Sequence, residues 1–120
     1  MKFPRMALAA ALFVLASPVW AHAFLDHAVP SVGGAVSGSP GELTLTFSEG
    51  VVPAFSGVAL TSAAGASIPT GKARVDPATP ATLHVPLGGK LAPGTYVVNW
   101  HVVSDDTHRT SGSYKFTVSP

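Results

Sequence analysis

The sequence predicts an all-β domain, built as an antiparallel sandwich or a Greek-key barrel. Apolar and polar residues alternate with a period of two in several short segments, which is typical of strands with one buried face. Turn-forming pairs such as Pro40-Gly41 and Pro93-Gly94 separate these segments. Within residues 22–120, no stretch of ten residues carries the apolar stripe of an amphipathic helix. Short strands at this spacing favour a sandwich or barrel over a helical architecture.

Six segments are expected to be strands, in chain order. The clearest lies within residues 42–48, where Leu or Phe occupies every second position and a polar residue the positions between. All six are bounded by clusters of Gly, Pro, Ser, Asn or Asp. The expected strands are 24–29, 42–48, 55–61, 81–87, 95–103 and 113–118.

Residues 91–96, Leu-Ala-Pro-Gly-Thr-Tyr, open the fifth of these strands after a tight turn. They resemble the tyrosine corner of immunoglobulin-like sandwiches, in which the tyrosine hydroxyl bonds back to nearby backbone. Tyr96 is therefore expected to be structural, and Trp100, on the same face, to be buried rather than to stack on a substrate. The core predicted for the last two strands comprises Tyr96, Val98, Trp100, Val102, Tyr114, Phe116 and Val118.

Residues 1–21 have the features of a cleavable, helical secretory signal peptide. Lys2 and Arg5 give a basic opening, residues 7–16 form an apolar run, and Pro18 breaks that run before the small Ala21. The alternative of a retained membrane anchor is disfavoured because the apolar run is short for a bilayer span. The sequence therefore predicts two parts, the signal peptide 1–21 and a secreted, mature domain 22–120 with no stable membrane insertion after cleavage.

Cleavage would change the charge and the sulfur content of the protein. Without Lys2 and Arg5, five of the seven basic residues remain against six acidic ones, so the formal charge moves from +1 to −1. This balance disfavours binding to nucleic acid or to an anionic membrane surface. The sequence has no cysteine, and Met1 and Met6 are its two methionines. The mature domain would thus lack disulfides and every sulfur ligand for a metal.

A short polar connection joins the last two expected strands, over residues 104–112. It holds Asp105, Asp106 and His108, which alone is weak evidence because Asp and Thr are common in turns. Cleavage before His22 would add a chelating pair, since an amino-terminal histidine offers its α-amine and ring nitrogen to one ion. His22, Asp106 and His108 together suit a tetragonal Cu(II) centre, although Zn(II) or Ni(II) would accept the same donors.

The other three histidines are expected to lie outside the metal site. His27 should have a structural or peripheral role, since its strand side differs from that of His22. His84 should point to solvent, because it alternates with Leu83 and Val85. His101 should lie on the outer face of its strand or in a satisfied hydrogen bond, with a supporting role near the metal loop as the alternative.

Several motifs follow one another along residues 22–120. They are the leading His22-Ala23, the run LTLTFSE at 43–49, the Leu-x-Pro-Gly-x-Tyr turn, Trp100, VSDDTH at 103–108 and GSYKFTV at 112–118. Together they resemble the CopC family of periplasmic copper-resistance proteins. The resemblance implies a cupredoxin-like β-sandwich with one Cu(II) bound by His22, Asp106 and His108. It also implies that Glu49 lies near the metal as a weak ligand or as a partner of the ligands.

The resemblance further implies a protein that sequesters or carries copper, with an inner-membrane importer of the CopD type as its partner. Some family members hold Cu(I) in a methionine-rich loop, but residues 61–70 contain neither Met nor His. A single Cu(II) site without enzymatic activity is therefore expected. Two alternatives remain: a histidine-brace copper oxidase resembling lytic polysaccharide monooxygenases, and a purely structural sandwich.

Overall fold

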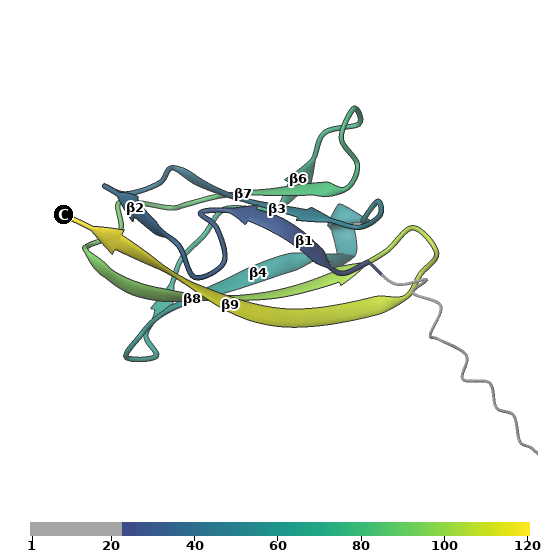
Figure 1. The fold of residues 1–120 in the computed structure, drawn as a ribbon. Coiled ribbons are helices and arrows are strands. Elements are labelled where there is room, and N and C mark those ends of the chain that lie inside the picture. The colour runs from purple at the N-terminus through teal and green to yellow at the C-terminus, as the bar shows by residue number, and fades with distance from the viewer. Residues whose placement is uncertain (1–22) are drawn as a thin grey trace, which may run out of the picture.

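The computed structural model describes residues 23–120, which form two facing β-sheets (Figure 1). The predicted signal peptide 1–21 and His22 lie outside the described residues, so the boundary between residues 21 and 22 stays a prediction. The strands are β1 (Leu25–Val29), β2 (Ala35–Ser37), β3 (Glu42–Phe47), β4 (Gly57–Ser62), β5 (Ser67–Ile68), β6 (Arg74–Val75), β7 (Thr82–Pro86), β8 (Gly94–Val103) and β9 (Arg109–Ser119), with one 3-10 helix, η1 (Pro53–Phe55).

The two sheets have different sizes and connectivity. One sheet has the order β1-β3-β7-β6 and the other the order β2-β9-β8-β4-β5. Neighbouring strands run antiparallel except for β2, which pairs parallel with the last residues of β9. The prediction of an all-β sandwich is confirmed, with this short parallel pair as its one departure from an antiparallel pattern among the described strands.

The core lies between the sheets and contains every residue predicted for the last two strands. Trp100 is 8 % exposed, and its ring meets that of Phe47 edge to face at 5.1 Å between centroids. Gly112, the cross-strand partner of Trp100, makes room for the indole, because a Cβ there would lie 2.6 Å from Trp100 Cζ2. The expectation that Trp100 belongs to the core is confirmed.

The tyrosine corner is also present. The Tyr96 hydroxyl donates a hydrogen bond of 2.6 Å to the carbonyl oxygen of Ala92, four residues earlier in the turn that opens β8. This bond satisfies the polar end of a buried ring. Tyr96 is thus structural, as its motif predicted.

Two expected strand starts differ from the structure by two or more residues. Phe55 ends η1 instead of beginning a strand, since Pro53 fixes a backbone angle suited to a helical turn. β9 begins at Arg109, earlier than expected, because ten consecutive residue pairs join it to β8. The described residues include no helix with the length and apolarity needed to cross a bilayer.

Candidate metal centre

The connection between β8 and β9 is a compact turn held by its own backbone. The amide of Ser104 donates to the carbonyl of His108 at 2.9 Å, and the amide of Thr107 donates to the carbonyl of Ser104 at 2.8 Å. Thr107 closes the turn with a φ of 68°, which is rare for a β-branched residue. This turn places the residues on either side of Thr107 next to each other.

Asp106 and His108 form a pair in this turn. Asp106 Oδ2 lies 3.2 Å from His108 Nδ1, and the two side chains are 40 % and 51 % exposed. The fully buried Ser104 donates its hydroxyl to the other carboxylate oxygen, Oδ1. The turn therefore presents one oxygen donor and one nitrogen donor side by side at the surface.

The surroundings of Asp106 favour its ionised form. The hydrogen bond from the Ser104 hydroxyl holds the pKa of Asp106 below its ordinary value, desolvation partly opposes this, and hydrogen bonds and charge from His108 add to the lowering. Metal ions bind the deprotonated carboxylate. The turn thus extends to lower pH the form of Asp106 that can act as a ligand.

The first described residues lie against this same end of the sandwich. The Thr110 hydroxyl donates to the carbonyl of Ala23 at 2.5 Å, and Ala23 is completely buried. Phe24 and Ser48 are joined twice, by Phe24 N to Ser48 Oγ at 3.0 Å and by Ser48 N to Phe24 O at 2.9 Å. Two segments far apart in sequence therefore hold the chain immediately after His22.

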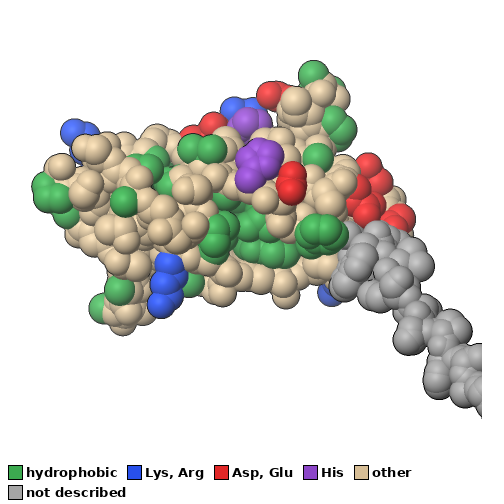
Figure 2. Space-filling view, viewed as in Figure 1, with side chains coloured by type: hydrophobic (Ala, Val, Ile, Leu, Met, Phe, Trp, Pro, Cys, Tyr) green, Lys and Arg blue, Asp and Glu red, His purple; other side chains and the backbone are tan. Residues whose placement is uncertain are grey.

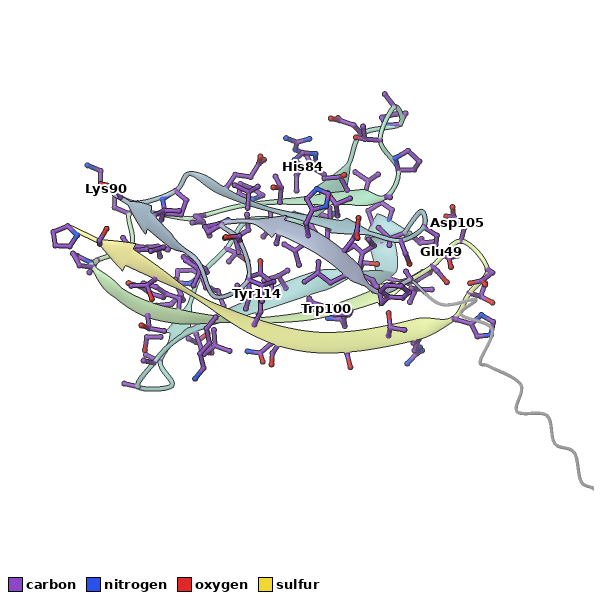
Figure 3. All side chains as sticks on the ribbon, viewed as in Figure 1. Glu49, His84, Lys90, Trp100, Asp105 and Tyr114 are labelled. Carbon is purple, nitrogen blue, oxygen red and sulfur yellow. The ribbon has the colours of Figure 1, made fainter. Side chains whose placement is uncertain are left out.

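The turn that follows β3 brings Glu49 to the same end. Gly50 accepts a hydrogen bond of 3.1 Å from the amide of Asp105, and the Asp105 carboxylate packs closely over the Gly50 Cα. Figure 3 shows Glu49 and Asp105 together at this end of the molecule, and Figure 2 shows acidic side chains gathered there. Asp105 faces Gly50, whereas Asp106 faces His108. The second contact agrees with the expectation that Asp106 and His108, which are two residues apart, share a side.

Within residues 23–120 no group of three His, Cys, Asp or Glu side chains is arranged to hold a metal ion. Asp106 and His108 supply two donors, and Glu49 lies nearby. His22, the third ligand predicted from the sequence, lies outside the described residues. The donor types present, carboxylate oxygen and imidazole nitrogen, are suited to Cu(II) and other borderline divalent ions.

Sequence reasoning missed two residues that organise this end. Ser104 lies two residues beyond the buried Val102 and so continues the inward-facing positions of β8. The period of two along the strand could therefore have identified it as a buried polar residue. Thr110 binds a carbonyl 87 residues away in sequence. Nothing in the local pattern could have indicated that second contact.

The remaining histidines lie apart from Asp106 and His108. His27 is exposed and pairs with its neighbour Asp26 at 3.4 Å, and His101 lies on the outer face of β8. His84 also faces outward, but its expected solvent exposure was wrong, because its side chain is only 18 % exposed. It is covered by Glu42, whose Oε1 lies 3.3 Å from His84 Nδ1.

Known proteins resemble the chain over nearly all of its described length. The family model for the CopC domain matches residues 25–119. Protein YobA of Escherichia coli K12 is 45% identical over 115 residues, which cover 95% of this chain and 93% of that protein. Copper resistance protein C of Escherichia coli is 35% identical over 104 residues, 82% of each chain.

Two solved structures share the fold. The crystal structure of CopC from Methylosinus trichosporium OB3b superposes with a TM-score of 0.78 at 36% identity, covering 82% of this chain and 95% of that one. PcoC, described as a methionine-rich copper resistance protein from Escherichia coli, gives a TM-score of 0.74 at 35% identity and covers 82% and 100%.

Proposed function

The chain belongs to the CopC family, and on that premise we propose that its mature form binds one Cu(II) ion in the periplasm and sequesters or carries it in copper resistance. The proposed ligands are His22, Asp106 and His108, with Glu49 as a weak ligand or as a partner of the ligands. The family match supports a copper-binding protein over the oxidase and structural alternatives.

The observation that carries this proposal is the Thr110–Ala23 hydrogen bond. It holds the residue after His22 against the strand that begins directly after His108. His22 directly precedes the anchored Ala23, and consecutive Cα atoms are about 3.8 Å apart. After cleavage, its α-amine and imidazole would both be within reach of the Asp106–His108 pair.

The donor set favours the oxidised ion. Residues 22–120 contain no sulfur, so the soft ligands that select Cu(I) are missing. An ionised Asp106 would add negative charge, which stabilises Cu(II) relative to Cu(I). The methionine-rich character in the description of PcoC has no counterpart in this chain.

The exposure of the site supports transfer of copper to another protein. Asp106 and His108 are about half exposed at one tip of the sandwich, so a receiving protein could approach the ion directly. We propose an inner-membrane importer of the CopD type as this receiver.

The test compares two forms of residues 22–120, one with the free α-amine of His22 and one in which this amine is acetylated. Acetylation converts the α-amine to an amide and adds no new amine. Cu(II) affinity, measured by competition with a chelator, should fall by about 100-fold or more in the acetylated form. Equal affinities would reject amino-terminal chelation.

Electron paramagnetic resonance of the Cu(II) protein checks the ligands independently. The spectrum should show nitrogen coordination that changes in His22→Ala and in His108→Ala. Peroxide formation driven by ascorbate tests the oxidase alternative. Turnover that depends on His108 would overturn the assignment as a carrier.

A further inference from the structure

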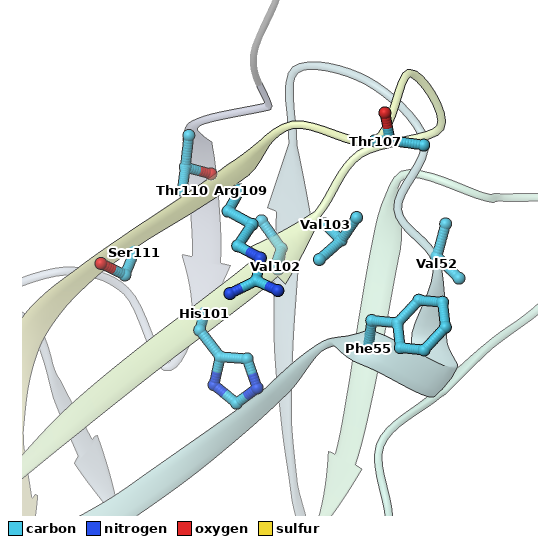
Figure 4. A pocket seen from close by; sticks show the side chains of 9 residues that line it. All are labelled: Val52, Phe55, His101, Val102, Val103, Thr107, Arg109, Thr110 and Ser111. Atoms are coloured by element: carbon cyan, nitrogen blue, oxygen red, sulfur yellow. The ribbon is translucent and has the colours of Figure 1, made fainter.

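A groove of about 780 Å³ lies on the outer face of the five-stranded sheet, beside the turn that holds Asp106 and His108 (Figure 4). It contains neither of those two residues, and only Thr107 belongs to both the groove and the turn. The residues that define its chemistry are Val52, Phe55, His101, Val103 and Arg109. The groove therefore adjoins the proposed copper site and shares Thr107 and Thr110 with its surroundings, but it includes neither Asp106 nor His108.

One wall of the groove is fixed by hydrogen bonds. Val52 donates its amide to the carbonyl of Val103 at 2.8 Å. The Ser56 hydroxyl donates to the carbonyl of Val52 at 2.7 Å and accepts from the amide of Val103 at 3.1 Å. These bonds bracket η1 and hold Phe55 at the rim with its side chain 65% exposed. The aromatic wall is thus preformed.

The opposite wall is polar. The imidazole of His101 lies over Gly57, where an added Cβ would be only 3.2 Å from His101 Cε1. Figure 4 shows the Arg109 guanidinium extending over the sheet toward the His101 ring. Both groups are exposed to solvent on adjacent strands. A ligand between them would meet several N–H donors at once.

The charge of Arg109 is not balanced within the groove. The six carboxylates of the chain lie elsewhere, at Asp26, Glu42, Glu49, Asp76, Asp105 and Asp106, and none lines the groove. In the described residues, no carboxylate oxygen lies within salt-bridge distance of Arg109, in contrast to Arg74, which pairs with two acids. The groove thus combines an unneutralised guanidinium with an exposed aromatic ring.

We propose that this groove binds a small amphipathic carboxylate, a monoanion with a short aliphatic or aromatic body. Arg109 would pair with the carboxylate in the planar geometry that guanidinium favours. His101 would hydrogen-bond the same group, and the apolar body would rest between Val103 and Phe55. A few convergent polar groups beside an apolar wall are the usual composition of small-molecule sites.

The groove fits this ligand better than a phosphate or a nucleic acid. A single guanidinium gives weak attraction for a multiply charged backbone, and the valine and phenylalanine walls offer nothing to an inorganic anion. The site needs a ligand that is charged at one end only.

The test is a heteronuclear NMR titration of metal-free residues 22–120 with benzoate. Saturable shifts should centre on Arg109, His101 and Phe55, with a dissociation constant on the order of millimolar, since one ion pair in an open groove binds weakly. Benzamide keeps the ring without the charge, and acetate keeps the charge without the ring. Both should bind at least about tenfold more weakly than benzoate.

Two variants assign the contributions. Arg109→Gln should weaken benzoate binding by about tenfold or more, whereas the matched change Lys115→Gln, also an exposed cation of β9, should leave it unchanged. Phe55→Ala should reduce benzoate affinity to that of acetate. Equal binding of benzamide and benzoate, an unaffected Arg109→Gln variant or an absence of saturation would each overturn the proposal. Because metal is absent throughout, none of these results depends on the copper site.

Discussion

Two histidine–carboxylate pairs on this molecule have nearly the same geometry and different surroundings. His108 Nδ1 lies 3.2 Å from Asp106 in the turn at the tip of the sandwich, and His84 Nδ1 lies 3.3 Å from Glu42 on the outer face of the four-stranded sheet. Arg74 lies 3.2 Å from Glu42 and 3.5 Å from Asp76, and His84 Nε2 lies 3.9 Å from Asp76 Oδ2, so a guanidinium already pairs with both carboxylates of the second cluster. Figure 3 shows His84 on the opposite side of the sandwich from Trp100 and β9.

The difference shows that a short imidazole–carboxylate distance does not define a metal site. At His84 the neighbouring carboxylates of Glu42 and Asp76 are already paired with the Arg74 guanidinium. At His108 no Lys or Arg within the described residues pairs with Asp106, and the hydrogen bond from the buried Ser104 hydroxyl lowers the pKa of that carboxyl. The chain following His22 is also anchored there and not at His84. The two pairs therefore differ in whether a guanidinium pairs with the carboxylate and in whether the chain after His22 is anchored beside them.

Removing each imidazole in turn gives the largest expected contrast. His108→Ala should lower Cu(II) affinity by about 100-fold or more, because a proposed ligand is lost. His84→Ala should leave the affinity within about twofold, since His84 is not a proposed ligand and Arg74 already pairs with both carboxylates beside it. Competition titration of both variants measures the two values. Comparable losses would mean that copper also uses the His84 cluster.

The hydroxyl of Ser104 should have the next largest effect on copper. Ser104→Ala removes the bond that orients Asp106 and should lower Cu(II) affinity by about tenfold, the usual consequence of losing a partner of a ligand. A double-mutant cycle with Asp106→Ala is the control. If Ser104 acts through Asp106, its substitution should change little once Asp106 is absent; full additivity would show that Ser104 only supports folding.

Thr107 allows a test of the turn apart from its donors. Its φ of 68° is strained for a β-branched residue. Thr107→Gly relieves this strain and also removes the hydrogen bond that the Thr107 hydroxyl donates to the carbonyl of Asp106. Because that bond is exposed, the free energy of unfolding should still rise by about 0.5–1 kcal/mol, while Cu(II) affinity changes by less than about threefold. Ser113→Gly, in the extended strand β9, is the matched control and should lower stability. Urea unfolding curves measure both, and a destabilised Thr107→Gly variant would contradict strain at this position.

The sequence predicted much of the fold because its longer strands alternate over five or more residues. The strands β2, β5 and β6 contain two or three residues each, too few for a period to be visible, and were missed. Both tyrosine-corner and core assignments followed from local motifs. The pairing of Arg74 with Glu42 could not be predicted from a local motif, because it depends on the register of β6, β7 and β3.

The proposed site likewise has one part that was predictable from the sequence and one part that was not. Asp106 and His108 share one turn, so their proximity was predictable from spacing. The contact from Thr110 to Ala23 and the approach of Asp105 to Gly50 arise only when distant strands pair. The sequence could therefore name the donors of the turn, while the anchoring of the amino-terminal segment beside them required the tertiary structure.

The smallest expected effect is the response of the metal-free protein to acid. The pKa of Asp106 in the fold lies below its ordinary value of 3.8, so as the pH falls the unfolded chain takes up this proton first. The stability that Asp106 contributes is complete above the unfolded pKa and is lost as the pH falls through the folded one. Asp106→Asn should therefore lose less stability than the native chain below about pH 4. Urea midpoints of the two proteins across this range would test the assignment, and parallel curves for Asp106→Asn and the native chain would show that Ser104 and His108 do not stabilise the ionised carboxylate.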